Sequence, residues 1–370
     1  MTVHTRSHIL DRIGQELDAP VLAYVTGDRP GMETQVAVDV VPRMRRHLKA
    51  IGHQERIALL IHTRGGDTNA PWPMINTVRA HCEHLTVLVP YFAHSAGTLL
   101  TLGADQILMT RYSTLSPIDP TVANAFNPQD PADAAVRLPI AVEDVMAFLE
   151  LADKAGDSSA KAEAFRRLAE SVHPLALGNV QRSINQIRQL AQKMIRLAGA
   201  KASEAQVQTM IDRLTTQSYS HSHQLTRREA LDIGLPIGET SAQVEELMLD
   251  YYDELCTDLE LMVKFDPPAL LRSAAPVSAP VGAPVPPAGE PGTAVQGSAP
   301  VPTVSVPPAV LVRNERGYLE TASTCDAYVT AGTVSYQMVN QPSMPPGFPQ
   351  PIPQQAVAFE IVFDQWEQVV

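Results

Sequence analysis

The 370-residue sequence is poor in cysteine, aromatic residues and positive charge. Its three cysteines are far apart and odd in number, which argues against a disulfide framework or a cysteine zinc site and fits a reducing compartment. Aromatic residues make up only 5%, so the core must consist mainly of aliphatic side chains. Lys and Arg number 28 against 40 Asp and Glu, and this net charge of −12 argues against binding to nucleic acid or an anionic membrane.

Long apolar runs are also missing from the sequence. No stretch of about 18 uncharged apolar residues occurs, and the N-terminus has no apolar segment of signal-peptide length. We therefore expect no transmembrane segment and a cytoplasmic location. There is no GxxxxGK, CxxC or HExxH motif, so we expect neither a nucleotide cofactor nor a metal.

Proline divides the chain into three parts. Twelve of the 31 prolines fall between Pro267 and Pro308, among Ala, Val, Gly and Ser, which predicts an extended linker without a packed core. We predict one domain over residues 1–265, a Pro/Ala-rich linker over 266–308 and a small β-rich C-terminal region over 309–370. The role of that last region is unknown, and it or the linker is a candidate for recruiting a partner.

Short apolar runs alternate with helical patterns in the first part. Strands are expected over 21–27, 56–63, 85–92 and 106–109, and helices over 34–52, 70–82 and 95–103. Such alternation predicts an α/β fold in which a parallel sheet is covered by helices on both faces. From 141 to 214 the pattern becomes continuously helical, and we predict a helical insertion there.

Two of these segments carry candidate chemistry, IALLIHTRGGDT and YFAHSAGTLLTLGAD. Consecutive glycines after a strand allow backbone N–H groups to face a cleft, and a serine at a strand-to-helix junction exposes its hydroxyl near the positive end of the helix. Together they predict a nucleophile, Ser95, and an oxyanion hole from Gly65 or Gly66 and Ala96. Either segment alone would indicate only a turn or close helix packing.

A serine hydroxyl needs a base, and histidine with a supporting carboxylate is suited to that task. His62 is expected to be buried in its strand, and His94 to diverge from its neighbour Ser95. His221 and His223 precede a predicted helix, and the residues by themselves do not choose between them. Asp119, in SPIDP, is equally well explained as a turn residue before proline.

The order of IHTRGGDT, AHSAGTLLTLGADQILMTRYSTLSPIDP and SHSHQLTRREALDIGLPI resembles the serine dehydrogenase proteinase family, ClpP/SppA-like serine peptidases related to signal peptide peptidase A. The resemblance covers residues 15–260 and implies a ClpP/crotonase-like core, a peptide or protein substrate, no cofactor and a homo-oligomer. It implies Ser95 as nucleophile, Asp119 as acid and His221 as base, with His223 as the alternative base.

Three other interpretations stay open. Signal peptide peptidases use a Ser–Lys dyad, for which the nearest lysines after Ser95 are Lys154 and Lys161, both in the charged helical insertion. Crotonase-like acyl-CoA enzymes use two backbone N–H groups of the same architecture without a serine nucleophile. The chain could also be a catalytically inactive scaffold or a peptide-binding protein.

Overall fold

The computed structural model describes residues 2–369 apart from 119–120, 123, 132, 134, 156–157, 200–201, 216–222, 275–276, 281–302, 307–308 and 340–353. The chain divides into two compact units. The first comprises Met1–Val263, Arg316–Ala327 and Glu367–Val370, and the second comprises Lys264–Glu315 and Tyr328–Trp366.

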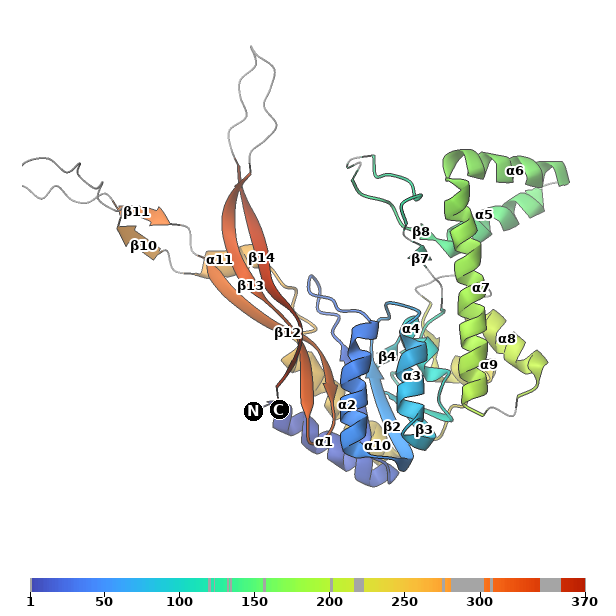
Figure 1. Cartoon of the computed structure of the whole chain (residues 1–370), viewed down its shortest axis with the longest axis horizontal. Coiled ribbons are helices and arrows are strands. Elements are labelled where there is room, and N and C mark those ends of the chain that lie inside the picture. The colour runs from blue at the N-terminus through green and yellow to red at the C-terminus, as the bar shows by residue number, and fades with distance from the viewer. Residues whose placement is uncertain are drawn as a thin grey trace, which may run out of the picture. The chain divides into compact units, whose positions relative to one another are not determined.

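A parallel sheet forms the core of the first unit (Figure 1). Its parallel strands, in spatial order, are β1 (Val21–Thr26), β2 (Gln54–His62), β3 (Cys82–Val89) and β5 (Gln106–Met109). The register places Leu22 beside Leu59, Leu59 beside Val87 and Val87 beside Ile107, so one row of apolar side chains crosses the whole sheet. The predicted α/β fold with a parallel core is confirmed.

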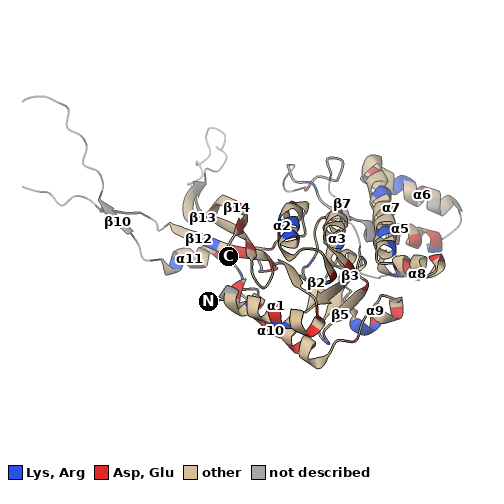
Figure 2. Cartoon of the chain, turned by 60° about the horizontal axis from the view of Figure 1, so that its bottom comes forward, with Lys and Arg blue, Asp and Glu red and all other residues tan. Residues whose placement is uncertain are grey.

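Helices cover both faces of this sheet (Figure 2). On one face α2 (Val41–Ile51) contacts α3 (Pro71–Arg79), which contacts α4 (Ala96–Thr101), and on the other α1 (Thr2–Leu17) packs against α10 (Ala242–Asp258). The helix expected over 34–52 was predicted too long at its start, since only a 3₁₀ turn, Val38–Val40, precedes α2. Val36 instead pairs with Gly66, and Pro42 occupies the first turn of α2, where proline is well tolerated.

The expected helical insertion is confirmed and consists of four helices. They are α5 (Val142–Ala155), α6 (Ser158–Ser171), α7 (Pro174–Leu197) and α8 (Glu204–Thr215), preceded by the short strands β7 (Thr121–Val122) and β8 (Ile140–Ala141). The helix α9 (Arg227–Ile233) leads back to the core. None of the helices in the described part of the chain is long and apolar enough to cross a membrane.

The C-terminal region is rich in β structure, as expected, and its strand β12 (Val310–Glu320) adds to the core sheet. The end of β12 pairs antiparallel with β1, from Thr26 opposite Gly317 to Ala23 opposite Glu320. Gly27 N–H donates to the Arg316 carbonyl at 2.7 Å, which extends this pairing.

A buried arginine joins distant parts of the first unit. Arg6 of α1 is fully buried and pairs with Glu320 (Nε–Oε1 2.9 Å, Nη2–Oε2 3.0 Å) and with Asp258 of α10. Tyr251 donates to Glu320 Oε1 at 2.7 Å, and the guanidinium lies 3.8 Å from the centre of the Tyr318 ring. Burial alone would lower the pKa of Arg6, but the hydrogen bonds and charge of Glu320 reverse this and raise that pKa. The cluster connects α1, α10 and β12.

The greater part of three long strands, in the order β14, β13, β12, belongs to the second unit. Here β13 spans Cys325–Val339 and β14 spans Gln354–Gln368, and a separate hairpin pairs β10 (Val277–Pro280) with β11 (Thr303–Val306). The linker was expected to be extended throughout, but Pro267–Ser273 forms the helix α11. Asp266 accepts a hydrogen bond from Ala269 N–H at the start of this helix, and prolines fit its first turn.

Candidate active site

The structure brings Gly65 and Ser95 into direct contact. Gly65 follows β2 with φ +108, and a Cβ on it would lie 2.8 Å from Ser95 Cβ and 2.9 Å from the His94 carbonyl oxygen. Only glycine adopts that conformation without strain and leaves room for Ser95 at that distance. The glycine turn after one strand and the serine after another therefore belong to one site.

Ser95 has a strained backbone. It links β4 (Phe92–Ala93) to α4 and has φ +50 and ψ −111, a conformation that costs a non-glycine residue about 1–3 kcal/mol. A sharp strand-to-helix turn of this kind presents the nucleophile in α/β-hydrolases. Ser95 is 8% exposed, and within the described part of the chain no group hydrogen-bonds to its hydroxyl.

Backbone N–H groups near Ser95 that have no acceptor among the described residues include those of Ala96 and Gly66. Ala96 is the first residue of α4, where N–H groups lack an intrahelical partner. Val36 N–H donates to the Gly65 carbonyl, and Asp67 N–H donates to the Val36 carbonyl, at 2.8 Å each. In this parallel bridge the N–H of Gly66 points away from Val36. By contrast, Gly65 N–H already donates to Thr63 Oγ1 at 3.0 Å.

A small three-stranded sheet gathers the segments next to the predicted triad. Its order is β4, β6 (Thr114–Leu115) and β9 (Leu225–Thr226), with β4 parallel to β6 and β9 antiparallel to it. Because of these directions, the chain after β4, the chain after β6 and the chain before β9 all leave the sheet at the same end. Ser95, Asp119 and His221 lie on those three segments.

Asp119 and His221 themselves lie outside the described residues, but described residues on either side of them contact one another. In the sequence, Asp119 follows β6 by four residues and His221 precedes β9 by four residues. Ile118 N–H donates to the Leu214 carbonyl at 2.8 Å, and Leu115 pairs with Leu225. Both ends of the segment that carries His221 are thus held against the segment that leads to Asp119.

Two other histidines near the site have side chains engaged elsewhere. His94 Nε2 lies 2.9 Å from Thr114 Oγ1, and its ring stacks on Phe92 at 5.0 Å. His223 is exposed, and its Nε2 lies 3.2 Å from an oxygen of Glu229. That glutamate also caps the start of α9, where it accepts the Thr226 N–H.

His62 is buried, as expected, and faces away from α4. A Cβ on Gly97 of α4 would lie 2.5 Å from Thr63 Cγ2, whereas the His62 ring packs 5.0 Å from Tyr252 of α10. Consecutive strand residues point to opposite faces, so His62 lies across the sheet from α4. Its Nε2 is 3.8 Å from Asp28 Oδ1, close enough for an ion pair but too long for a hydrogen bond, and neither ring nitrogen has a hydrogen-bond partner in the described structure. Burial lowers the pKa of His62.

We expect this buried, neutral ring to make the fold acid-sensitive. Below the reference pKa of about 6.5 the unfolded chain binds a proton that the folded ring resists, so the free energy of unfolding falls by up to ~1.4 kcal/mol per pH unit. Urea unfolding at pH 7.5, 6.5 and 5.5 measures this loss. His62→Leu should flatten the curve between pH 6.5 and 5.5, and an unchanged slope in that variant would contradict the assignment.

The lysines required by a Ser–Lys dyad lie on the helical insertion. Lys154, near the end of α5, is exposed to solvent. Lys161 is on α6, and its side chain lies outside the described part of the structure. No contact within the described residues links Lys154 to the Ser95 turn, so the geometry does not support it as a base.

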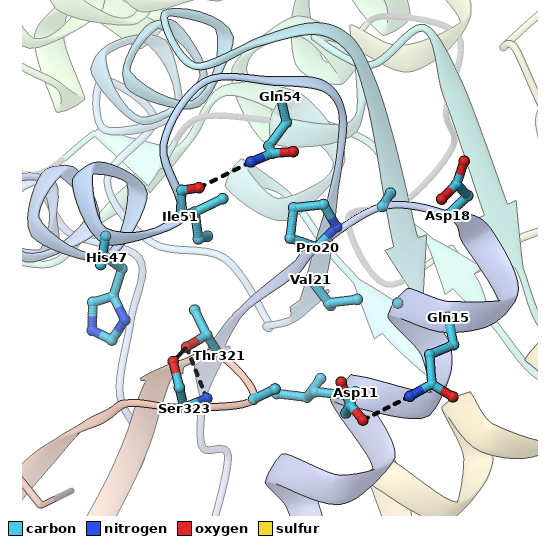
Figure 3. A pocket seen from close by; sticks show the side chains of 15 residues that line it. Asp11, Gln15, Asp18, Pro20, Val21, His47, Ile51, Gln54, Thr321 and Ser323 are labelled. Carbon is cyan, nitrogen blue, oxygen red and sulfur yellow. Dashed lines mark hydrogen bonds between the residues drawn. The ribbon is translucent and has the colours of Figure 1, made fainter.

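A cavity of about 430 Å³ lies at the other end of the parallel strands, around the starts of β1 and β2 (Figure 3). Polar groups in its wall already have partners. His47 Nδ1 lies 2.9 Å from Thr324 Oγ1, Gln15 Nε2 donates to Asp11, and Gln54 Nε2 donates to the Ile51 carbonyl. The paired groups and the distance from the strand ends that carry Gly65 and Ser95 separate this cavity from the candidate active site.

Two buried hydroxyls that hold the Ser95 turn were not predicted from the sequence. Ser116 Oγ accepts the Ser95 N–H at 2.7 Å, and Thr98 Oγ1 accepts the Ser116 N–H at 3.0 Å. Thr98 is fully buried and Ser116 is 3% exposed. The only signal in the sequence is the serine in LSPIDP, three residues before the predicted aspartate, and no spacing rule connects it to Ser95.

Residues 34–144 match the model of the ClpP-like SDH-type serine proteinase family. The matched segment contains the glycine pair, Ser95 and Asp119, and it confirms the family resemblance of the signature strands. His221 lies beyond it.

Two relatives from Methanocaldococcus jannaschii extend the similarity beyond this proteinase segment. Uncharacterized protein MJ0137 is 26% identical over 254 residues, which cover 68% of this chain and 74% of that protein. Uncharacterized protein MJ1495 is 24% identical over 198 residues, or 54% of this chain and 57% of its own length. Neither name states an activity that could be compared with this chain.

Solved structures resemble the chain only loosely. A variant of the 1510-N membrane-bound stomatin-specific protease has a TM-score of 0.37 at 14% identity, covering 62% of this chain and 85% of its own. ClpP1 from Listeria monocytogenes has a TM-score of 0.32 at 14% identity, covering 63% and 99%. Likenesses of this size assign neither substrate nor mechanism.

Proposed function

We propose that the chain is a serine peptidase that cleaves peptide bonds without a cofactor. The observation that carries the proposal is the strained serine of a strand-to-helix turn in contact with a glycine turn, inside a segment that matches a serine proteinase family. Strain at a single non-glycine residue persists where the surrounding structure holds it, and such residues cluster at active sites.

Ser95 Oγ would attack the peptide carbonyl carbon, and His221 would take the hydroxyl proton and pass it to the leaving amine. Asp119 would hold the imidazole in the required tautomer. The convergence of the three segments at one end of the β4–β6–β9 sheet supports this assignment. A homo-oligomer and a cytoplasmic location stay predictions.

The N–H groups of Ala96 and Gly66 are the donors that we assign to the oxyanion. Both lack another acceptor among the described residues, whereas Gly65 N–H is taken by Thr63. Each such donor contributes about 3 kcal/mol to stabilising the transition state in related acyl transfers. Gly65 then serves to let the β2 end approach Ser95.

A fluorophosphonate probe tests the proposal without knowledge of the substrate, because it reacts with activated serines. We expect the native protein to acquire one adduct, located at Ser95 by peptide mass spectrometry. Ser95→Ala and heat-unfolded protein should remain unlabelled. Peptide hydrolysis by Ser95→Ala should be lower than that of the native protein by about 10⁴-fold or more.

Absence of labelling in the folded protein, or an adduct at another serine, would contradict the peptidase proposal. A crotonase-like enzyme would instead bind an acyl-CoA thioester and keep its activity in Ser95→Ala. An inactive scaffold would give neither labelling nor turnover.

A further inference from the structure

We propose that Ser116 is a positioning residue that holds the backbone of Ser95 in its reactive conformation. The inference rests on the proposed function, since it assigns to Ser116 a role in presenting the nucleophile. Ser116 stands within the LSPIDP motif, 21 residues after Ser95, but no spacing rule connects the two serines.

The Ser116 hydroxyl makes two hydrogen bonds, and the one that it accepts comes from the Ser95 backbone. Its hydrogen is donated to the Pro117 carbonyl at 3.0 Å, which leaves an oxygen lone pair for the Ser95 N–H at 2.7 Å. Both residues are buried, so water cannot easily replace either bond. The Ser95 amide therefore depends on this single side chain for its acceptor.

Thr98 fixes the backbone of Ser116 in turn. Thr98 Oγ1 accepts the Ser116 N–H at 3.0 Å and lies within hydrogen-bond distance of the carbonyls of Ala93 (2.8 Å) and Ser116 (2.9 Å). The hydroxyls of Thr98 and Ser116 thus connect the end of β4, the first turn of α4 and the segment that leads to Asp119.

Ser95 needs such a restraint because its positive φ is unfavourable for an L-residue. Without the Ser116 acceptor, the Ser95 amide would be buried without a partner, and the turn would gain by relaxing toward negative φ. That relaxation moves Oγ relative to the Ala96 and Gly66 amides. A misplacement of about 1 Å costs about 10²-fold in rate, so we expect a loss in kcat rather than in KM.

The test compares rate constants for fluorophosphonate labelling of Ser95 in the full-length chain. Ser116→Ala removes the acceptor, Ser116→Thr retains it, and Ser116→Cys offers a weaker one of similar size. The matched control is Thr101→Ala, which deletes another fully buried hydroxyl. This hydroxyl of α4 donates to the Thr98 carbonyl at 2.7 Å and makes no hydrogen bond to Ser95 in the described structure. Melting temperatures of all variants report general destabilisation.

We expect Ser116→Ala to label 10- to 100-fold more slowly than wild type, Ser116→Cys to be intermediate, and Ser116→Thr to recover most of the rate. Thr101→Ala should stay within about 2-fold of wild type even where its melting temperature falls as much as that of Ser116→Ala. Should Ser116→Ala fail to fold, the labelling rates of Ser116→Cys and Ser116→Thr are compared instead to test the proposal. Equal rates for Ser116→Ala and Thr101→Ala, or for the Cys and Thr variants, would overturn the proposal.

Hydrogen exchange separates this inference from the peptidase proposal. The Ser95 amide should be protected in wild type and in Thr101→Ala and should exchange faster in Ser116→Ala. If wild type does not label at all, the peptidase proposal fails, yet the exchange data still show whether Ser116 restrains the turn. Unchanged exchange of the Ser95 amide in Ser116→Ala would refute the restraint.

Discussion

Replacing Arg6 with methionine should lower the free energy of unfolding by about 3–5 kcal/mol. The guanidinium is fully buried against Glu320 and Asp258, whose side chains are 2% and 4% exposed. Methionine fills most of the volume but leaves two buried carboxylates without a cation, and burying unpaired charge is far more costly than losing packing. Urea unfolding followed by circular dichroism measures the change.

Arg166→Met is the matched control for that substitution. Arg166 also pairs with two glutamates, Glu163 and Glu170, but all three side chains are about half exposed on α6. Water solvates those carboxylates once the arginine is removed, so we expect a change within about 1 kcal/mol. A loss in Arg6→Met no larger than that in Arg166→Met would show that the buried network contributes little.

A double variant distinguishes the loss of the attraction between Arg6 and Glu320 from the cost of leaving a buried carboxylate without a cation. Combining Arg6→Met with Glu320→Leu removes the buried carboxylate along with its cation, although Tyr251 then loses its acceptor. If the unpaired buried carboxylate causes most of the loss in Arg6→Met, this double variant should be more stable than Arg6→Met alone. Additive losses would instead favour direct attraction as the main contribution.

The strands and the reactive turns could be predicted from local patterns. Short apolar runs predicted the four parallel strands. Glycine after one predicted strand and serine after another identified the two turns that the structure brings into contact. The start of α2 could not be predicted this way. Val36 satisfies the helical period, yet its backbone pairs with the Gly65–Gly66 turn, a contact between segments 30 residues apart.

Long-range polar contacts could not be predicted from the sequence for the same reason. Arg6 and Glu320 are separated by 314 residues, and neither stands in a motif. Pairing of β12 with β1 brings them together, and the residues of the linker region give no indication of that pairing. Ser116 likewise acquires its role only because β6 lies beside β4.

The choice between His221 and His223 gives the largest effect expected on activity. Removing the catalytic base of a serine peptidase lowers turnover by about 10⁴-fold or more. We expect that loss for His221→Ala, and only a few-fold change for His223→Ala, because the exposed His223 ring lies against Glu229 at the start of α9. Fluorophosphonate labelling rates at pH 8 measure both.

Added imidazole separates a missing base from a damaged fold. If His221 is the base, imidazole should raise the labelling rate of His221→Gly by occupying the space of the lost ring, without altering that of Ser95→Ala. His223→Gly serves as the control for loosening of the segment before β9, since it makes the same change two residues closer to Leu225. The reverse pattern, with loss and rescue in His223→Gly, would move the base to the position nearer the strand. The convergence of segments at the β4–β6–β9 sheet would still hold, because both histidines lie on the segment that enters β9 beside Leu115.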